Sequence, residues 1–155
     1  MPSAVSPVPG GYHNVTPYLL IGGASEAINF YIRAFGAVEV LRLTTPDGRI
    51  GHAEIRIGDS HIMMADEHPE MDFLGPQKRG GTSVTMHLYV ADADSVFAQA
   101  IAAGATELRP LCDQFYGDRS GAVTDPWGHI WSIASRVEDV TPDEIQRRFQ
   151  ELYCD

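Results

Sequence analysis

The feature that most constrains the fold of this chain is an internal repeat. An apolar segment at residues 15–21 recurs at residues 84–90, and each copy is followed by a helical segment that ends in Gly-Ala. The same order continues through each copy, pairing residues 25–35 with 94–103, 49–51 with 119–121, and 61–63 with 129–131. Repetition at this scale is typical of a supersecondary unit used twice. We therefore predict two copies of one structural unit.

Each copy is expected to fold as a strand, a helix and three further strands. The first strand places Leu19 and Ile21 on one face, because side chains alternate along a strand. The helix that follows carries Ile28, Ile32 and Phe35 at spacings that form an apolar stripe. One face of the sheet and one stripe of the helix are thus predicted to pack together.

Glycine and proline mark where these elements end. Gly36 stands where a helix C-terminal cap belongs, since glycine accepts a positive φ. The sequence Pro46-Asp47-Gly48 predicts a turn, because proline pre-sets φ and glycine tolerates the left-handed region. This turn would join strands at residues 39–44 and 49–57 in a hairpin.

A final helix is predicted after the second copy. Thr141 can cap it, Pro142 suits its first turn, and Glu144 completes a capping box. The apolar side of this helix, formed by Ile145, Phe149 and Leu152, needs a packing partner, and a second subunit is one option.

The fold class is therefore α+β, with two tandem βαβββ modules and a C-terminal helix. The predicted segments are a flexible N-terminal arm at 1–11, a first module at 12–66, a polar connector at 67–82, a second module at 83–136, and a C-terminal helical segment at 137–155. The two modules together are expected to form one domain.

Charge and composition limit the classes of molecule that the protein is expected to bind and the compartment in which it is expected to act. The formal net charge is −10, from 21 acidic and 11 basic residues, which argues against nucleic acid and fits either a neutral or cationic ligand or plain solubility. No apolar run reaches the roughly 20 residues that a membrane span needs. Cys112 and Cys154 have no C-x-x-C partner, and the first residues do not read as a signal peptide. These features favour a reducing, cytoplasmic location.

Four phrases of the sequence resemble the vicinal oxygen chelate superfamily, which holds glyoxalase I, bleomycin-resistance proteins and extradiol dioxygenases. The resemblance is greatest to its PhnB-like branch and covers about residues 12–135. The phrases that carry it are HNVTPYL at 13–19, GHAEIRIGDS at 51–60, DQFYGDRSG at 113–121 and DPWGHIW at 125–131.

The resemblance implies curved mixed sheets around a cleft, helices on the outside, and in many members a homodimer. Metal-dependent members place His or Glu ligands on the first and last strands of each module. Transferred one at a time, these positions fall on Thr16, Met64, Thr85 and Ser132. Hydroxyls and a thioether bind a catalytic divalent ion poorly. The resemblance therefore implies a fold that keeps its cleft without metal ligands at the usual positions.

A relocated polar site is the main alternative. His52 and Glu54 alternate with apolar residues on one strand, and His87 shares the parity of Thr85. His52, Glu54 and His87 could hold a divalent metal or act in catalysis, with Tyr18 or Tyr89 as a hydroxyl donor. The competing interpretation is that these are hydrogen-bonded polar residues in a wet cavity. His61 and His129 are expected on the helix-packing side, together with Met63 and Trp131.

Aromatic residues supply candidate walls for a ligand. Phe115, Tyr116 and Trp127 are predicted to line the cleft or to pack in the core. Arg119 has two roles open to it: it could anchor an acidic group of a ligand, or form an ion pair that fixes its loop. The full set of predicted ligand-binding residues is Thr16, Tyr18, Thr85, His87, Tyr89, Phe115, Tyr116, Arg119, Trp127 and Ser132.

Three functions follow from these observations. The leading one is a small-molecule-binding protein of the glyoxalase/bleomycin-resistance type that sequesters an aromatic or cationic compound. The second is a lyase, isomerase or dioxygenase of the same superfamily, metal-dependent or metal-independent, with a relocated site. The third is an interaction module that uses the last helix.

Overall fold

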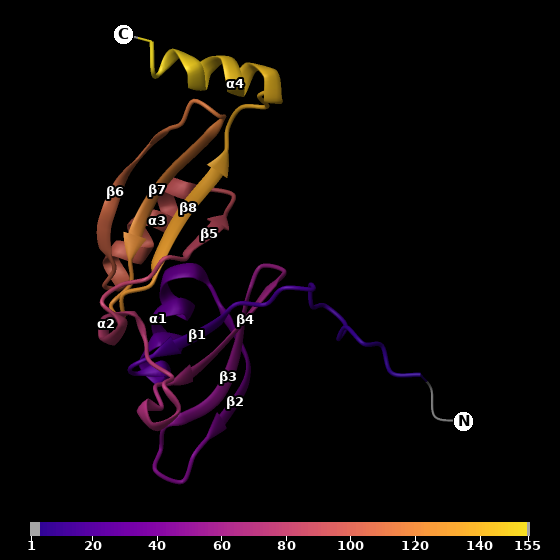
Figure 1. The fold of residues 1–155 in the computed structure, drawn as a ribbon, viewed down its shortest axis with the longest axis vertical. Coiled ribbons are helices and arrows are strands. Elements are labelled where there is room, and N and C mark those ends of the chain that lie inside the picture. Colours follow the sequence, from indigo (N-terminus) through magenta and orange to yellow (C-terminus); the bar gives the residue numbers. More distant parts are fainter. Residues whose placement is uncertain (1–3, 155) are drawn as a thin grey trace. The chain divides into compact units, whose positions relative to one another are not determined.

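A computed structural model describes residues 4–154 of the chain. These residues form two compact units that meet in sequence at Gly81 and Thr82. Each unit contains one four-stranded sheet (Figure 1). The first three residues of the expected N-terminal arm, and Asp155 at the end of the C-terminal segment, lie outside the described residues.

The first unit has the predicted βαβββ order. Its elements are β1 (Tyr18–Ile21), α1 (Ala24–Phe35), β2 (Val38–Thr44), β3 (Ile50–Ile57) and β4 (Ser60–Asp66). The sheet order is β1-β4-β3-β2, with β1 parallel to β4 and the other pairs antiparallel. After β4 the chain forms a short 3-10 helix, η1 (Pro69–Met71), and one further helical turn, α2 (Pro76–Arg79).

The second unit repeats this topology. Its elements are β5 (Thr85–Tyr89), α3 (Ala93–Ala103), β6 (Thr106–Asp113), β7 (Asp118–Thr124) and β8 (Ile130–Arg136), in the sheet order β5-β8-β7-β6. Again the first and last strands are parallel. The α+β fold with tandem βαβββ modules is therefore confirmed.

The C-terminal helix is also confirmed. Helix α4 (Pro142–Glu151) follows β8, and the Thr141 hydroxyl accepts a hydrogen bond from the backbone N–H of Glu144 at 3.3 Å. Its apolar residues Phe149 and Leu152 are 42% and 63% exposed. Within the second unit Phe149 contacts Phe115, with ring centroids 5.7 Å apart.

Helix α1 covers one face of the first sheet, but its buried stripe differs from the expected one. Ile28 and Phe35 are buried as predicted, whereas Ile32 is 41% exposed. Tyr31 and Ala34 are fully buried. The buried stripe of the helix therefore runs through Tyr31 and Ala34 in place of Ile32.

The predicted end of α1 and the hairpin turn are both confirmed. Gly36 adopts φ 67°, and its N–H donates to the carbonyl of Ile32. In the turn, the N–H of Gly48 donates to the carbonyl of Thr45 at 2.9 Å, with Gly48 at φ 88°. In both places the chain reverses at a positive φ that only glycine adopts freely.

Candidate functional site

The strand register shows which residues of the first unit share the sheet face away from α1. On β4, Met64 pairs with Leu19 and Ala53, and all three are buried on the helix side. Met63 instead neighbours Glu54 and Tyr18. The assignment of Met64 to the last-strand position was therefore wrong by one residue, and Met63 occupies it. A shift of one residue moves every side chain of a strand to the opposite face.

The same correction applies to His61, which lies on the open face and not against the helix. Its ring stacks on Tyr12, with centroids 3.9 Å apart and planes 19° apart. In the second unit the expectation is confirmed, since His129 and Trp131 are both buried. The indole N–H of Trp131 donates to Asp125 at 3.1 Å, so this aromatic belongs to the core.

A chain of hydrogen bonds connects four side chains on the open face of the first sheet. The phenol of Tyr18 lies 2.9 Å from Nδ1 of His52, and Nε2 of His52 lies 3.2 Å from Oε1 of Glu54. Tyr12 donates its hydroxyl proton to the other carboxylate oxygen of Glu54. Glu54 is buried, and both of its carboxylate oxygens have protein partners.

The charges of the groups in this hydrogen-bonded series determine which group donates and which accepts in each bond. The hydrogen bond from Tyr12, and after it the hydrogen bond and charge of His52, lower the pKa of Glu54, which favours its ionised form. An ionised Glu54 accepts the Nε2–H of His52, and Nδ1 of a neutral His52 is then an acceptor for the Tyr18 hydroxyl. Burial and the charge of Glu54 raise the pKa of Tyr18, so its phenol stays protonated. Tyr18 therefore offers an oxygen lone pair to a ligand.

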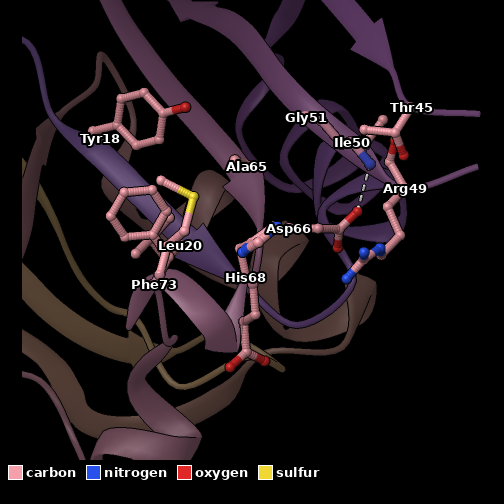
Figure 2. A pocket seen from close by; sticks show the side chains of 12 residues that line it. Tyr18, Leu20, Thr45, Arg49, Ile50, Gly51, Ala65, Asp66, His68 and Phe73 are labelled. Atoms are coloured by element: carbon pink, nitrogen blue, oxygen red, sulfur yellow. Dashed lines mark hydrogen bonds between the residues drawn. The ribbon is translucent and has the colours of Figure 1, made fainter.

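A cavity of about 590 Å³ lies beside Tyr18, wholly within the first unit. Figure 2 shows Tyr18, Leu20 and Phe73 on one side of it, and Arg49 and Asp66 on the other. Its remaining side-chain lining includes Met71, His68 and Glu67. We call it the aromatic cavity. Its volume suits a drug-sized molecule, and its mixture of apolar walls with a few polar groups is typical of ligand sites.

Asp66 shapes this cavity by tying three segments together. One oxygen accepts the backbone N–H groups of Gly23 and Ala24 at 3.0 and 2.9 Å, at the start of α1. The other accepts the N–H of Ile50 at 2.6 Å, at the start of β3 (Figure 2). Because its acceptor sites are used this way, Asp66 positions the cavity wall rather than offering a free carboxylate.

A second, smaller cavity of about 380 Å³ lies between the N-terminal segment and β4. It is lined by residues that include Pro7, Val8, Tyr12, Thr16, Glu54 and Met63. The predicted residues Thr16 and Glu54 thus lie together, and the segment preceding Tyr12 forms one wall.

The open face of the second sheet holds another group of predicted residues. Thr85, His87, Tyr116 and Ser132 line a cavity of about 590 Å³ within the second unit. Nδ1 of His87 lies 3.0 Å from the hydroxyl of Ser132. We call this the hydroxyl cavity. Tyr89 lies outside it and donates its hydroxyl to the buried Asp118 at 2.8 Å, which raises the pKa of Tyr89.

Besides Tyr89, three predicted ligand-binding residues do not line these cavities. Arg119 pairs with both oxygens of Asp94 at 2.7 and 2.8 Å and with Asp113 at 3.3 Å, as the ion-pair interpretation expects. The carbonyl of Phe115 accepts from Arg148 at 2.9 Å, which fixes that loop against α4. The N–H of Trp127 donates to Asp125 in the tight turn before β8.

The donor set does not fit the divalent metal that the fold suggests. With Met63 in place of Met64, the four positions carry two threonines, a methionine and a serine, which are weak ligands for such an ion. His52 and Glu54 lie together in the first unit, whereas His87 belongs to the second. Between residues 4 and 154 there is no group of three or more His, Cys, Asp or Glu side chains arranged to hold a metal.

Sequence reasoning missed several cavity residues. Met71 and Phe73 come from the connector, which was interpreted only as polar, although two large apolar residues within it were a usable signal. Arg109 and Gln114 line the hydroxyl cavity from β6 and the loop that follows. Nothing in the periodicity of the sequence distinguished them from surface residues.

Two further observations concern the cysteines and the helices. Cys112 and Cys154 are exposed free thiols. Across the described range 4–154, none of the helices is both long and apolar enough to pass through a lipid bilayer.

Comparison with known proteins agrees with this geometry. The uncharacterised protein Rv0887c of Mycobacterium tuberculosis is 45% identical over 135 residues, which cover 85% of this chain and 79% of that protein. The crystal structure of PA1353 from Pseudomonas aeruginosa has a TM-score of 0.68 at 25% identity, covering 81% of this chain and 99% of that one.

The PhnB protein of Bacillus cereus shares the fold, with a TM-score of 0.62 at 21% identity over 79% of this chain and 99% of that one. The family model described as "Glyoxalase/Bleomycin resistance protein/Dioxygenase superfamily" matches residues 13–133, which span both sheets. With its doubled βαβββ topology and this match over most of its length, the chain belongs to the glyoxalase/bleomycin resistance protein/dioxygenase superfamily.

Proposed function

We propose that this protein is a cytoplasmic small-molecule-binding member of its superfamily, and that it holds an aromatic, neutral or cationic compound in the aromatic cavity. The observation that carries the proposal is the composition of that cavity: Tyr18, Met71 and Phe73 provide flat or polarisable surfaces around a drug-sized volume. One version of this function is sequestration of a basic, aromatic antibiotic.

The aromatic groups and hydrogen bonding of the first unit, together with the net charge of the whole chain, support a cationic ligand. Aromatic faces such as those of Tyr18 and Phe73 attract a cation by cation–π interaction. The hydroxyl of Tyr18 donates to His52 and so presents an acceptor to ammonium or amide N–H groups. The net charge of −10 raises the local concentration of cations.

The experiment is a thermal-shift and calorimetric screen of aromatic ammonium compounds, each paired with an uncharged analogue of the same shape. At 100-fold excess over Kd, a ligand stabilises the protein by about 2.7 kcal/mol, which such a screen detects. Phe73→Ala should weaken binding about tenfold or more because it removes one aromatic wall. Tyr18→Phe keeps the ring and should weaken binding severalfold.

Phe149→Ala is the matched control, since Phe149 on α4 is 42% exposed and Phe73 is 44% exposed. The control should bind as the parent does. The proposal fails if neither the cationic nor the uncharged aromatic compounds bind. It also fails if Phe73→Ala and Phe149→Ala bind equally well.

A second candidate function is catalysis without a metal, favoured by the Tyr18–His52–Glu54 chain. A histidine oriented by a buried carboxylate and bonded to a hydroxyl is an arrangement that moves protons. If a bound compound is turned over, His52→Gln should lower the rate by about 10²-fold or more with binding retained. Equal turnover in the parent and in a variant lacking His52, Glu54 and His87 would exclude this mechanism.

We further propose that the protein forms a homodimer. The apolar residues Phe149, Leu152 and Tyr153 on and after α4 are exposed in the single chain, which is consistent with a subunit contact. Sedimentation of the full chain and of a chain ending at Val140 tests the role of α4. An unchanged oligomer after truncation would remove α4 from the contact, and a monomeric full chain would refute the dimer.

A further inference from the structure

The hydroxyl cavity of the second unit differs in charge from the rest of this acidic protein. The chain carries 21 acidic residues, yet no Asp or Glu is among the described residues that line this cavity. Its basic lining groups are the guanidinium of Arg109 and the imidazole of His87. A concave surface without carboxylates and with basic groups favours an anion.

Arg109 is available to a ligand. Many of the other arginines are bound to carboxylates, as Arg49 is to Asp47 and Arg119 to Asp94. For Arg109, the described residues provide no ion pair and no side-chain hydrogen bond. Its five N–H groups form a fork that matches two oxygens of a carboxylate or phosphate.

The other polar lining groups can complete the coordination of an oxyanion. In the His87–Ser132 pair, whichever group donates across the 3.0 Å contact, the other retains a proton that it can donate to a ligand. The hydroxyls of Thr85 and Ser120 line the same cavity. Ser120 and Ser132 are 5% and 8% exposed, so these hydroxyls are held by the packed sheet rather than by a mobile surface.

From these contacts we propose that the hydroxyl cavity is an oxyanion site, in which Arg109 holds the negative oxygens of a carboxylate, phosphate or phosphonate and the His87–Ser132 pair donates a further hydrogen bond. This cavity shares no lining residue with the aromatic cavity, so the oxyanion proposal can be tested independently of the proposed function. Arg109, on β6, thus takes the anchoring role that the sequence suggested for Arg119.

The test is a titration of the full-length protein, followed by ¹H–¹⁵N NMR and calorimetry, with inorganic phosphate, methylphosphonate and benzoate as separate probes. Sodium chloride keeps the ionic strength constant, because exposed charges are screened by salt. Saturable binding should shift the backbone signals of Arg109, Gly121 and Ser132. The tightest of the three probes identifies the oxyanion class.

Arg109→Gln should weaken binding about tenfold or more, since it removes a charge-assisted, bidentate contact. Ser132→Ala should weaken it severalfold. Arg56→Gln is the matched control because it removes the same charge from an exposed strand position in the first unit, and it should leave binding unchanged.

Two results would overturn the proposal. One is that none of the three probes binds saturably to the folded parent protein. The other is that Arg109→Gln binds as tightly as Arg56→Gln, which would mean that general charge and not this cavity attracts the anion. Circular dichroism of each variant verifies that the fold is intact, and Arg109→Lys, which keeps the charge without the fork, should show intermediate affinity.

Discussion

The two modules share one topology but differ on their open sheet faces. The first carries Tyr18, His52 and Glu54 in a hydrogen-bonded chain beside an aromatic cavity. At the matching strand positions the second carries His87 and Ser120, beside a cavity lined by hydroxyls and Arg109. The packed helix side specifies the fold, and the open face is free to diverge, so one duplicated scaffold can present two kinds of surface.

The start of each helix shows a related divergence. In the first module Gly23 precedes α1 without a side-chain cap, and Asp66 on β4 accepts the N–H groups of Gly23 and Ala24. In the second, Asp92 caps α3 itself, and Ser135 on β8 accepts the N–H of Ala93 at 2.8 Å. The start of α1 thus depends on a sheet residue alone, whereas the start of α3 uses both a sheet residue and the residue that precedes the helix.

The largest expected effect is a difference in stability between variants that lack one or the other of these capping groups. Asp66→Ala should lower the free energy of unfolding by about 3 kcal/mol, because the N–H groups of Ala24 and Ile50 lose their acceptor and that of Gly23 keeps only the carbonyl of Ile21. Ser135→Ala should cost about 1 kcal/mol, since Asp92 still caps α3. Urea unfolding of both variants measures the difference. A cost for Ser135→Ala equal to or above that for Asp66→Ala would contradict the assignment.

A smaller effect on stability is expected where the two sheets pack against their helices. Gly121 on β7 and Ala53 on β3 hold equivalent positions, but a Cβ on Gly121 would come within 2.9 Å of Phe97 and of the backbone of Leu111. Gly121→Ala should therefore cost about 2 kcal/mol through overpacking.

The reciprocal change, Ala53→Gly, should cost about 1 kcal/mol, because it removes one buried methyl group and loosens the strand. Urea unfolding of the pair provides the comparison. Equal tolerance of both substitutions would show that the two sheets pack alike at this position.

The smallest effect is a pH dependence of stability that arises from Glu54 in the first module. The hydrogen bonds from Tyr12 and His52 lower the pKa of Glu54 below its ordinary value of 4.5. A lowered pKa in the folded state stabilises the fold above the ordinary value, and this stability is lost as the pH falls through the folded-state pKa. The loss should be smaller in Glu54→Gln and in Tyr12→Phe than in the parent.

The measurement is the free energy of unfolding at several pH values from neutral down to the acid range below 4.5. Glu107→Gln, at an exposed position on β6, is the control and should follow the parent. Parallel pH profiles for the parent and Glu54→Gln would mean that the Tyr12–Glu54 contact contributes nothing to folding.

The sequence predicted the topology well, for physical reasons that can be named. The βαβββ order of both modules, the cap at Gly36 and the turn at Gly48 follow from the repeat and from local patterns of apolar spacing and glycine placement, whereas the sheets were implied by the family resemblance. The strand faces were predicted where alternation was strict, as for His52 and Glu54. These features depend on near neighbours in the chain.

The candidate site was predictable only in part, because it depends on distant contacts. Aligning His61 with His129 instead of with Ile130 put Met64 on the wrong face, and only the pairing of Tyr18 with Met63 corrects it. The wall formed by Phe73 and the partnership of Tyr12 with Glu54 arise from segments outside the repeat. No periodic pattern marks such contacts.

The central claim is that the two modules offer chemically opposite sites, and one NMR experiment tests it directly. The labelled protein is titrated with phenethylammonium and, in a separate sample, with inorganic phosphate. The account predicts that the cation shifts the backbone signals of Ala65, Met71 and Phe73, and that the anion shifts those of Arg109, Gly121 and Ser132. Overlapping sets of shifted residues, or saturable shifts with neither probe, would contradict it.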